Sequence, residues 1–251
     1  MIGPLSYVGG KNRLANKIIA LIPKHITYVE PFAGGAQVFF HKSPSKVEVL
    51  NDLDKEIVNF FRVCQQHYEE LVRYLKFTLM SRNWYDTYAQ MNPDTLTDVQ
   101  RAVRFFYLQK NSFGGLIVRQ NYHFNVTEPP HYNLERLPQL IEETHRRLAN
   151  VQIECTPYQD VLKRYDRPTT FFYLDPPYWN RFLYKYNFKE EDFIELERRL
   201  RLLKGKFILS LNDVPEVRKL FSKFKISGVN LAYTTQMKAG KRFKEVFIRN
   251  F

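Results

Sequence analysis

The chain has 251 residues, of which 44% are hydrophobic, 25% charged and 16% aromatic. This composition excludes a disordered, collagen-like or low-complexity protein and predicts one substantial core with room for a smaller lobe. No apolar run is long enough for a membrane helix, and the N-terminus lacks a signal peptide, so we expect a cytoplasmic protein with no membrane partner. The two cysteines lack metal-ligand spacing, which argues against a disulfide scaffold or a metal site.

The charge is strongly basic, with 38 Lys and Arg against 26 Asp and Glu, a net charge of +12. Residues 196–251 hold 14 basic and 4 acidic side chains, which is 10 of the 12 excess charges. Such an excess favours a polyanionic partner, because neutralising phosphates releases counterions. Runs such as Arg198-Arg199-Leu200-Arg201 are equally typical of a solvated helix face, so charge alone does not prove nucleic-acid binding.

Short apolar runs alternate with helical periodicity at both ends of the chain, a pattern typical of βαβ units. We expect strands at 28–30, 47–50, 151–155, 170–174, 207–211 and 245–250, and helices at 14–21, 56–64, 134–149, 192–203 and 215–221. Between these parts the strand signal vanishes, and helical stretches at 67–80, 82–90 and 97–110 precede a turn-rich segment, 111–125. We therefore predict an α/β fold in which residues 58–131 form an inserted lobe, while 1–57 and 132–251 form one domain. Consecutive prolines within 127–131 predict the linker at the end of the lobe.

Two glycine-bearing turns lie near the N-terminus. Tyr7-Val8-Gly9-Gly10-Lys11 precedes the first helix, and alone it is more often a simple loop. Val29-Glu30-Pro31-Phe32-Ala33-Gly34-Gly35-Ala36-Gln37 reads as a strand, a turn and a helix start, where glycines let a ligand approach the backbone and the helix offers unpaired N–H groups. Neither GxGxxG nor GxxxxGK[ST] is present, so a different nucleoside ligand must be considered.

The second strand ends in Asn51-Asp52-Leu53-Asp54. Asp52 follows Gly35 by 17 residues, close to the ~20-residue offset at which an acidic side chain meets a ribose hydroxyl. A lone acidic residue here would more often cap the helix at 56–64, and Asp54 can take that role.

The most specific motif is Asp175-Pro176-Pro177-Tyr178, which follows a buried-strand run. Reactive groups of open α/β sheets lie at such carboxyl ends of strands. The prolines stiffen the turn, so the Asp175 carboxylate and the Pro176 carbonyl can accept hydrogen bonds from both N–H groups of a planar NH2 group. Tyr178 can stack on the ring that carries this group. This geometry suits a base extruded from a duplex, although the tetrapeptide alone could also be a turn with a packed tyrosine.

In this order the motifs resemble the Dam-like family of DNA adenine-N6 methyltransferases, over nearly the whole chain. Phe124-Asn125-Val126 resembles the family's stretch after its recognition hairpin, and Cys155-Thr156-Pro157-Tyr158 stands at its cofactor-adenine motif. The resemblance implies a Rossmann-like fold with an inserted target-recognition lobe, S-adenosylmethionine as cofactor and double-stranded DNA as partner. We also expect a monomer or weak dimer.

The resemblance further implies the role of each residue. Asp175, Pro176, Pro177 and Tyr178 would be catalytic; the cofactor would meet Tyr7, Lys11, Glu30, Phe32, Gly34, Gly35, Asp52, Tyr158 and Asp175; and DNA would meet Asn111, Arg119, Asn121 and Asn125. Two departures matter: Pro157 replaces an Asp that contacts the cofactor adenine in many relatives, and the hairpin at 114–124 aligns imperfectly. Arg119 near the hairpin tip could read guanine or touch phosphate, and the resemblance suggests a short palindrome such as GATC.

Other functions stay open at this stage. Cytosine-N4 methylation is possible because the same acceptors serve that amino group. A glutamine amide or an RNA base is a further substrate, although glutamine methylators would carry Asn at position 175. The fold could also persist in a catalytically idle DNA-binding regulator.

Overall fold

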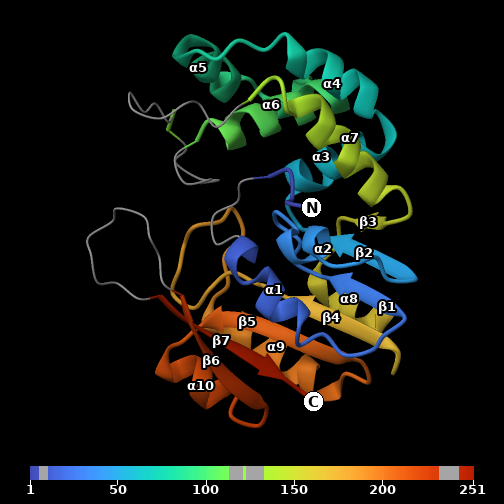
Figure 1. The fold of residues 1–251 in the computed structure, drawn as a ribbon. Helices are drawn as coiled ribbons and strands as arrows, with labels where there is room; N and C mark the ends of the chain where they lie inside the picture. Colours follow the sequence, from blue (N-terminus) through green and yellow to red (C-terminus); the bar gives the residue numbers. More distant parts are fainter. Residues whose placement is uncertain (6–10, 113–120, 123–132, 232–242) are drawn as a thin grey trace.

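The computed structural model describes residues 1–5, 11–112, 121–122, 133–231 and 243–251. In this part of the chain a seven-stranded sheet has the order β3-β2-β1-β4-β5-β7-β6 (Figure 1). The strands are β1 Thr27–Glu30, β2 Val47–Asn51, β3 Gln152–Glu154, β4 Thr170–Leu174, β5 Lys206–Asn212, β6 Lys225–Leu231 and β7 Phe243–Arg249. The first five are parallel, whereas β7 runs antiparallel to both β5 and β6. The sheet confirms the predicted α/β, Rossmann-like fold.

Helices cover both faces of the sheet because successive strand residues point to opposite sides. Tyr28 and Phe171 pack with α1, α2, α3 and α7, while their neighbours Val29 and Phe172 pack with α8, α9 and α10. These helices are α1 Ala15–Ile19, α2 Gln37–His41, α3 Lys55–Gln66, α7 Leu137–Leu148, α8 Tyr158–Tyr165, α9 Glu190–Leu202 and α10 Pro215–Leu220. A 3-10 turn, η1 Lys11–Arg13, precedes α1.

The helices α4 Tyr68–Lys76, α5 Arg82–Gln90 and α6 Asp98–Lys110 gather beyond one end of the sheet (Figure 1). A short 3-10 turn, η2 Pro93–Thr95, joins α5 to α6. Thr97 and Gln100 form a reciprocal cap that starts α6. The Phe106 ring of α6 stacks on Phe60 of α3 at 5.3 Å, so α3 supports both the sheet and these helices. A division after residue 57 would therefore cut one continuous helix.

The structure contains one strand, β6, and one helix, α8, that the sequence analysis did not predict. Strand β6 contains Gly228 and is the last strand in the sheet order, so it lacks the continuous apolar run of the buried strands. Helix α8 has only Tyr158, Val161 and Leu162 buried among mostly polar residues. The strands and helices that the sequence did predict are present, and their ends differ from the predicted ones by a few residues.

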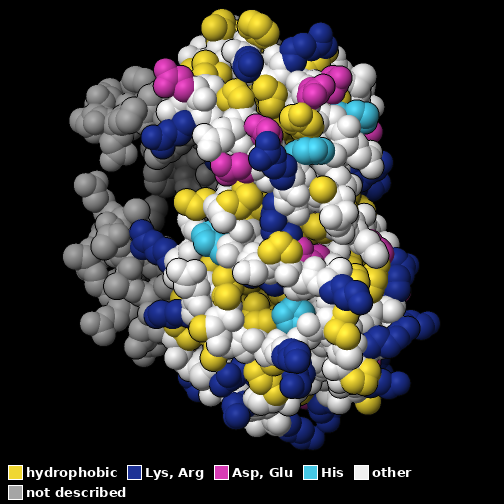
Figure 2. All heavy atoms as spheres, turned by 45° about the vertical axis from the view of Figure 1, so that its right-hand side comes forward, with side chains coloured by type: hydrophobic (Ala, Val, Ile, Leu, Met, Phe, Trp, Pro, Cys, Tyr) yellow, Lys and Arg dark blue, Asp and Glu magenta, His cyan; other side chains and the backbone are white. Residues whose placement is uncertain are grey.

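Lys and Arg side chains are spread over the lower part of the molecule in Figure 2. Several basic residues of the C-terminal region have acidic partners: Arg199 pairs with Glu195, Arg201 with Glu197, and Arg218 with Asp213. The α9 pairs lie one turn apart, as expected for a solvated helix face. Among the described residues, no helix is long and apolar enough to cross a membrane.

Candidate active site

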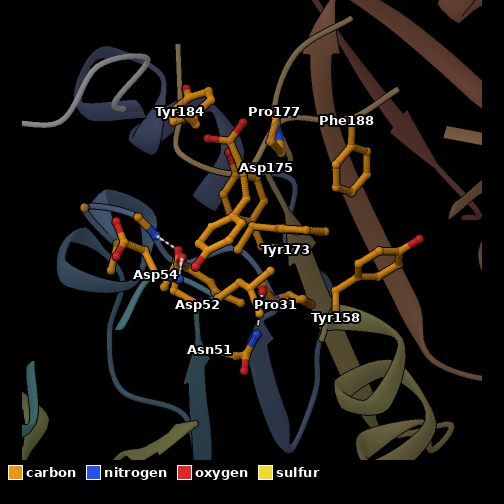
Figure 3. A pocket seen from close by; sticks show the side chains of 18 of the residues that line it. Pro31, Asn51, Asp52, Asp54, Tyr158, Tyr173, Asp175, Pro177, Tyr184 and Phe188 are labelled. Atoms are coloured by element: carbon orange, nitrogen blue, oxygen red, sulfur yellow. Dashed lines mark hydrogen bonds between the residues drawn. The ribbon is translucent and has the colours of Figure 1, made fainter. Parts of the chain in front are cut away.

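The carboxyl ends of β1, β2 and β4 border one cavity of about 540 Å³. Strand β1 lies between β2 and β4, so the chain order reverses at this point of the sheet. Open α/β sheets bind their ligands in the crevice at such a reversal. The volume falls within the range of about 300–1,000 Å³ that is typical of small-molecule and cofactor sites. Figure 3 shows Asp52 and Asp54 on one side of the cavity, Tyr158 and Phe188 on the other, and Asp175 at one end.

The turn between β1 and α2 forms one wall of the cavity. Gly34 has φ of 48°, in the left-handed region that glycine adopts without strain, and Ala36 is held at the same φ. The Ala36 N–H donates to the Ala33 carbonyl at 2.6 Å, and α2 begins at the next residue. This tight turn brings the backbone of Gly34 and Gly35 to the cavity surface.

Asp52 joins this turn to the end of β2. Its carboxylate accepts hydrogen bonds from Gly34 N at 2.8 Å and from Asp54 N at 2.9 Å. Burial nevertheless raises the pKa of Asp52 to about 6. Asp54 accepts from Glu56 N and caps α3, which confirms the sequence prediction and leaves Asp52 to face the cavity.

Asn51 ties three strand ends together behind this wall. Its amide donates to the Pro31 carbonyl at 2.8 Å and to the Thr156 carbonyl at 3.0 Å, and accepts from Thr156 N at 2.9 Å. The side chain is 1% exposed, so each of these bonds is shielded from water. Sequence reasoning placed Asn51 in the motif without finding this role, because its partners lie 20 and 105 residues away.

Three aromatic rings form the opposite wall. Phe32 lies 5.1 Å from Tyr158 and 5.7 Å from Phe188, and Tyr158 lies 5.7 Å from Phe188, measured between ring centroids. The Tyr158 hydroxyl points away from the cavity in Figure 3, so the ring supplies an apolar surface. Phe188 was not predicted from the sequence because it lies in an irregular segment before α9 that carries no motif.

Asp175 lies directly after β4, at one end of the cavity. Its Oδ1 is 2.9 Å from Lys11 Nζ, and that ammonium also lies 4.8 Å from the centroid of the Tyr178 ring. Burial raises the pKa of Asp175 to about 6, while Lys11 acts in the opposite direction and Glu245 adds to the rise. Glu245, on β7, is a residue of this cluster that the sequence did not reveal.

The motif loop is attached to the neighbouring strand. Trp179 N donates to Asn212 Oδ1 at 2.9 Å, and Asn212 Nδ2 donates to the Trp179 carbonyl at 3.2 Å. Pro176 is buried and Pro177 lines the cavity. The end of β5 thus holds the turn that presents Asp175.

Glu30 borders the cavity but is 1% exposed. One of its carboxylate oxygens accepts from the Tyr28 hydroxyl at 2.6 Å and from Phe39 N at 2.9 Å. Burial raises the pKa of Glu30 to about 8. These contacts give Glu30 an internal role in joining β1 to α2.

The residues predicted to meet DNA fall into two groups. Asn111 is buried at the end of α6, where its amide donates to the Tyr107 carbonyl, so the structure places it inside the lobe rather than on a DNA-facing surface. Asn121 is exposed beside an antiparallel bridge between Ser112 and Tyr122, which pairs the ends of the expected hairpin. Arg119, Asn125 and, in the first motif, Tyr7 lie outside the described residues.

Comparison with known proteins identifies the family. The model of the D12 class of N6 adenine-specific DNA methyltransferases matches residues 7–235. The type II methyltransferase M1.LlaDCHI of Lactococcus lactis subsp. cremoris is 28% identical over 98% of this chain and 94% of its own length. The type II methyltransferase M.CviBI of Paramecium bursaria Chlorella virus NC1A is 26% identical over 96% of this chain and 95% of its own length. The DNA adenine methylase of Escherichia coli K12 is 27% identical over 69% of this chain and 64% of its own length.

The family model covers most of the chain, including every described residue that lines the cavity, from Lys11 to Asp192. Residues that come from three strand ends and an irregular segment meet around one cavity. The chain therefore belongs to the D12 class of N6 adenine-specific DNA methyltransferases.

Proposed function

We propose that the cavity binds S-adenosylmethionine and that Asp175 presents the adenine amino group to it. The observation that carries this proposal is that Asp175 lines the same 540 Å³ cavity as Asp52 and the aromatic wall. The donor set fits the cofactor: a carboxylate suits ribose hydroxyls, the rings of Phe32 and Tyr158 suit a planar base, and the backbone of Gly34 and Gly35 suits a close-lying methionine part.

The cofactor supplies an electrophilic methyl group on its sulfonium sulfur. The exocyclic amine of adenine is a weak nucleophile because its lone pair is delocalised into the ring. Asp175 and the Pro176 carbonyl accept hydrogen bonds from its two N–H groups and orient the nitrogen, and such orientation lowers a barrier by up to ~7–11 kcal/mol in well-aligned systems. The new N–C bond would replace the S–C bond of the cofactor, which would leave as a neutral thioether, and the methylated nitrogen would release one proton. The carboxylate also opposes the positive charge that develops on nitrogen.

The target base has to leave the duplex, because Asp175 at the end of its cavity cannot reach an amino group inside stacked base pairs. Tyr178 would then stack on the extruded ring. The basic excess of the chain supports a DNA partner, and the lobe around α6 carries the paired hairpin ends. We assign target recognition to this lobe, with DNA contacts at Asn121, Arg119 and Asn125.

The recognised sequence is proposed to be a short palindrome such as GATC, with Arg119 reading guanine. Arg119→Ala should then relax discrimination at one base pair by about 1–3 kcal/mol. A uniform loss over all single-base variants of the site, with a smaller salt dependence, would instead assign Arg119 to phosphate. We further propose that the protein acts in the cytoplasm as a monomer or weak dimer.

Calorimetric binding of S-adenosylmethionine tests the cofactor assignment. Asp52→Asn and Tyr158→Ala should each weaken binding by roughly tenfold or more, since each loses either a charged hydrogen bond or a ring contact. Asp160→Asn is the matched control, because Asp160 is exposed on α8 away from the cavity lining. Unchanged affinity in both site variants would remove the assignment.

A further inference from the structure

A buried ammonium lies beside the carboxylate that the reaction uses. Lys11 is 4% exposed, and its Nζ is 2.9 Å from Asp175 Oδ1 and 3.9 Å from Glu245 Oε2. The Tyr178 ring lies 4.8 Å from the same nitrogen. A hydrogen-bond donor with no acceptor capacity therefore stands next to the acceptor that receives the target amine.

Neutralisation of Asp175 is one function of this ammonium, because burying an isolated charge is costly. The cluster goes beyond that requirement. It holds two carboxylates around one ammonium, and that ammonium lies 4.8 Å from the centroid of the Tyr178 ring, on which the base is proposed to stack. Lys11 also lines the cavity, so a base entering beside Asp175 meets the ammonium directly.

The arrangement matches the edge of adenine. The N6 amino group is a donor, and the ring nitrogens beside it, N7 and N1, are acceptors. An acceptor at Asp175 and a donor at Lys11, 2.9 Å apart, complement such a donor–acceptor pair. Guanine and thymine present the carbonyl oxygens O6 and O4 instead, which the Asp175 carboxylate repels.

We infer that Lys11 is a substrate-binding residue that donates a hydrogen bond to the ring nitrogen next to the target amino group, and that Glu245 positions Lys11 for this contact. The inference rests on the proposed role of Asp175. It adds a second contact to the base, where the resemblance assigned Lys11 to the cofactor alone.

Adenine analogues at the target position test this contact. The measured quantity is kcat/KM on DNA carrying adenine divided by kcat/KM on DNA carrying 7-deazaadenine or 1-deazaadenine, for the wild type and for Lys11→Met. Because each ratio is taken within one protein, a change in the folded fraction cancels. The wild type should lose roughly 10- to 100-fold on one of the two analogues, the usual size for a hydrogen bond to a charged donor.

Lys11→Met should lose no more than about threefold on that same analogue, since the donor is already absent. Lys163→Met, at an exposed lysine of α8, should keep the wild-type ratio. Glu245→Gln keeps the size of the side chain but removes its charge, and should lower the ratio part of the way. A purely structural role for Glu245 would leave it unchanged.

Identical ratios in wild type and Lys11→Met, for both analogues, would overturn the inference. This failure is distinct from failure of the proposed function. If Asp175→Ala abolishes transfer while Lys11→Met keeps the wild-type ratios, only the contact from Lys11 is wrong. If Asp175→Ala retains turnover, the proposed role of Asp175 is wrong as well.

Discussion

The Asn51 side chain is the most sharply testable support of the cofactor cavity. Asn51→Ala removes two donated bonds, at 2.8 and 3.0 Å, and two accepted bonds, from Thr156 N at 2.9 Å and Thr156 Oγ1 at 3.3 Å, and leaves the Pro31 and Thr156 carbonyls without this partner. Each hydrogen bond contributes about 0.5–1.5 kcal/mol net, so the four together predict a loss of about 2–6 kcal/mol in the free energy of unfolding. That is a large part of the roughly 5–15 kcal/mol typical of a domain.

Urea unfolding and calorimetric binding of S-adenosylmethionine measure the two consequences. We expect lower stability together with weaker cofactor binding, because Pro31 and Thr156, which Asn51 joins, both line the cavity. Asn51→Asp keeps the volume and the bond from Thr156 N but turns both donations into repulsions, so it should destabilise at least as much at pH 8. The exposed Asn83→Ala should stay within about 0.5 kcal/mol. An Asn51→Ala variant within that same margin, with unchanged cofactor affinity, would refute this reasoning.

Three further predictions follow from the site. Because burial raises the pKa of Asp175 to about 6, methyl transfer should fall as the pH drops through 6 and the carboxylate stops accepting from the amine; a rate that stays flat from pH 8 to 5 would contradict this. The pKa of Glu30 is raised from an ordinary 4.5 to about 8, so between these pH values the folded state retains a proton that the unfolded chain loses. The free energy of unfolding should therefore fall as the pH rises from 5 to 8, and Glu30→Gln should flatten this fall when urea unfolding is measured at both pH values. Asn212→Ala should loosen the Trp179 loop and lower kcat roughly tenfold while cofactor affinity stays within twofold, and an unchanged kcat would argue against the anchoring role.

The α/β fold was predictable because its buried strands are continuous apolar runs such as Thr170–Leu174, with all five residues buried. Edge strand β6 was missed because its pairing with β7, and not its composition, makes it a strand. Helix α8 was missed because few of its residues are apolar. The position of the lobe boundary was obscured for a similar reason, since α3 packs on both sides of it.

The site residues that follow strands could be read from the sequence, because Asp52 and Asp175 stand at the carboxyl ends where ligands bind. Phe188 and Glu245 could not, because neither lies in a motif and both reach the site through tertiary packing. Asn111 shows the opposite error: a polar residue at a helix end looked available for DNA, but its amide is used by the Tyr107 carbonyl.

Identification of the methylated base tests the central claim most directly. The wild-type protein is incubated with DNA and S-adenosylmethionine labelled in its methyl group, and the digested DNA is separated into its nucleosides. The account predicts label in N6-methyladenine and none after Asp175→Ala, while that variant still binds cofactor and DNA. Label in N4-methylcytosine, or turnover near the wild-type rate in Asp175→Ala, would contradict it.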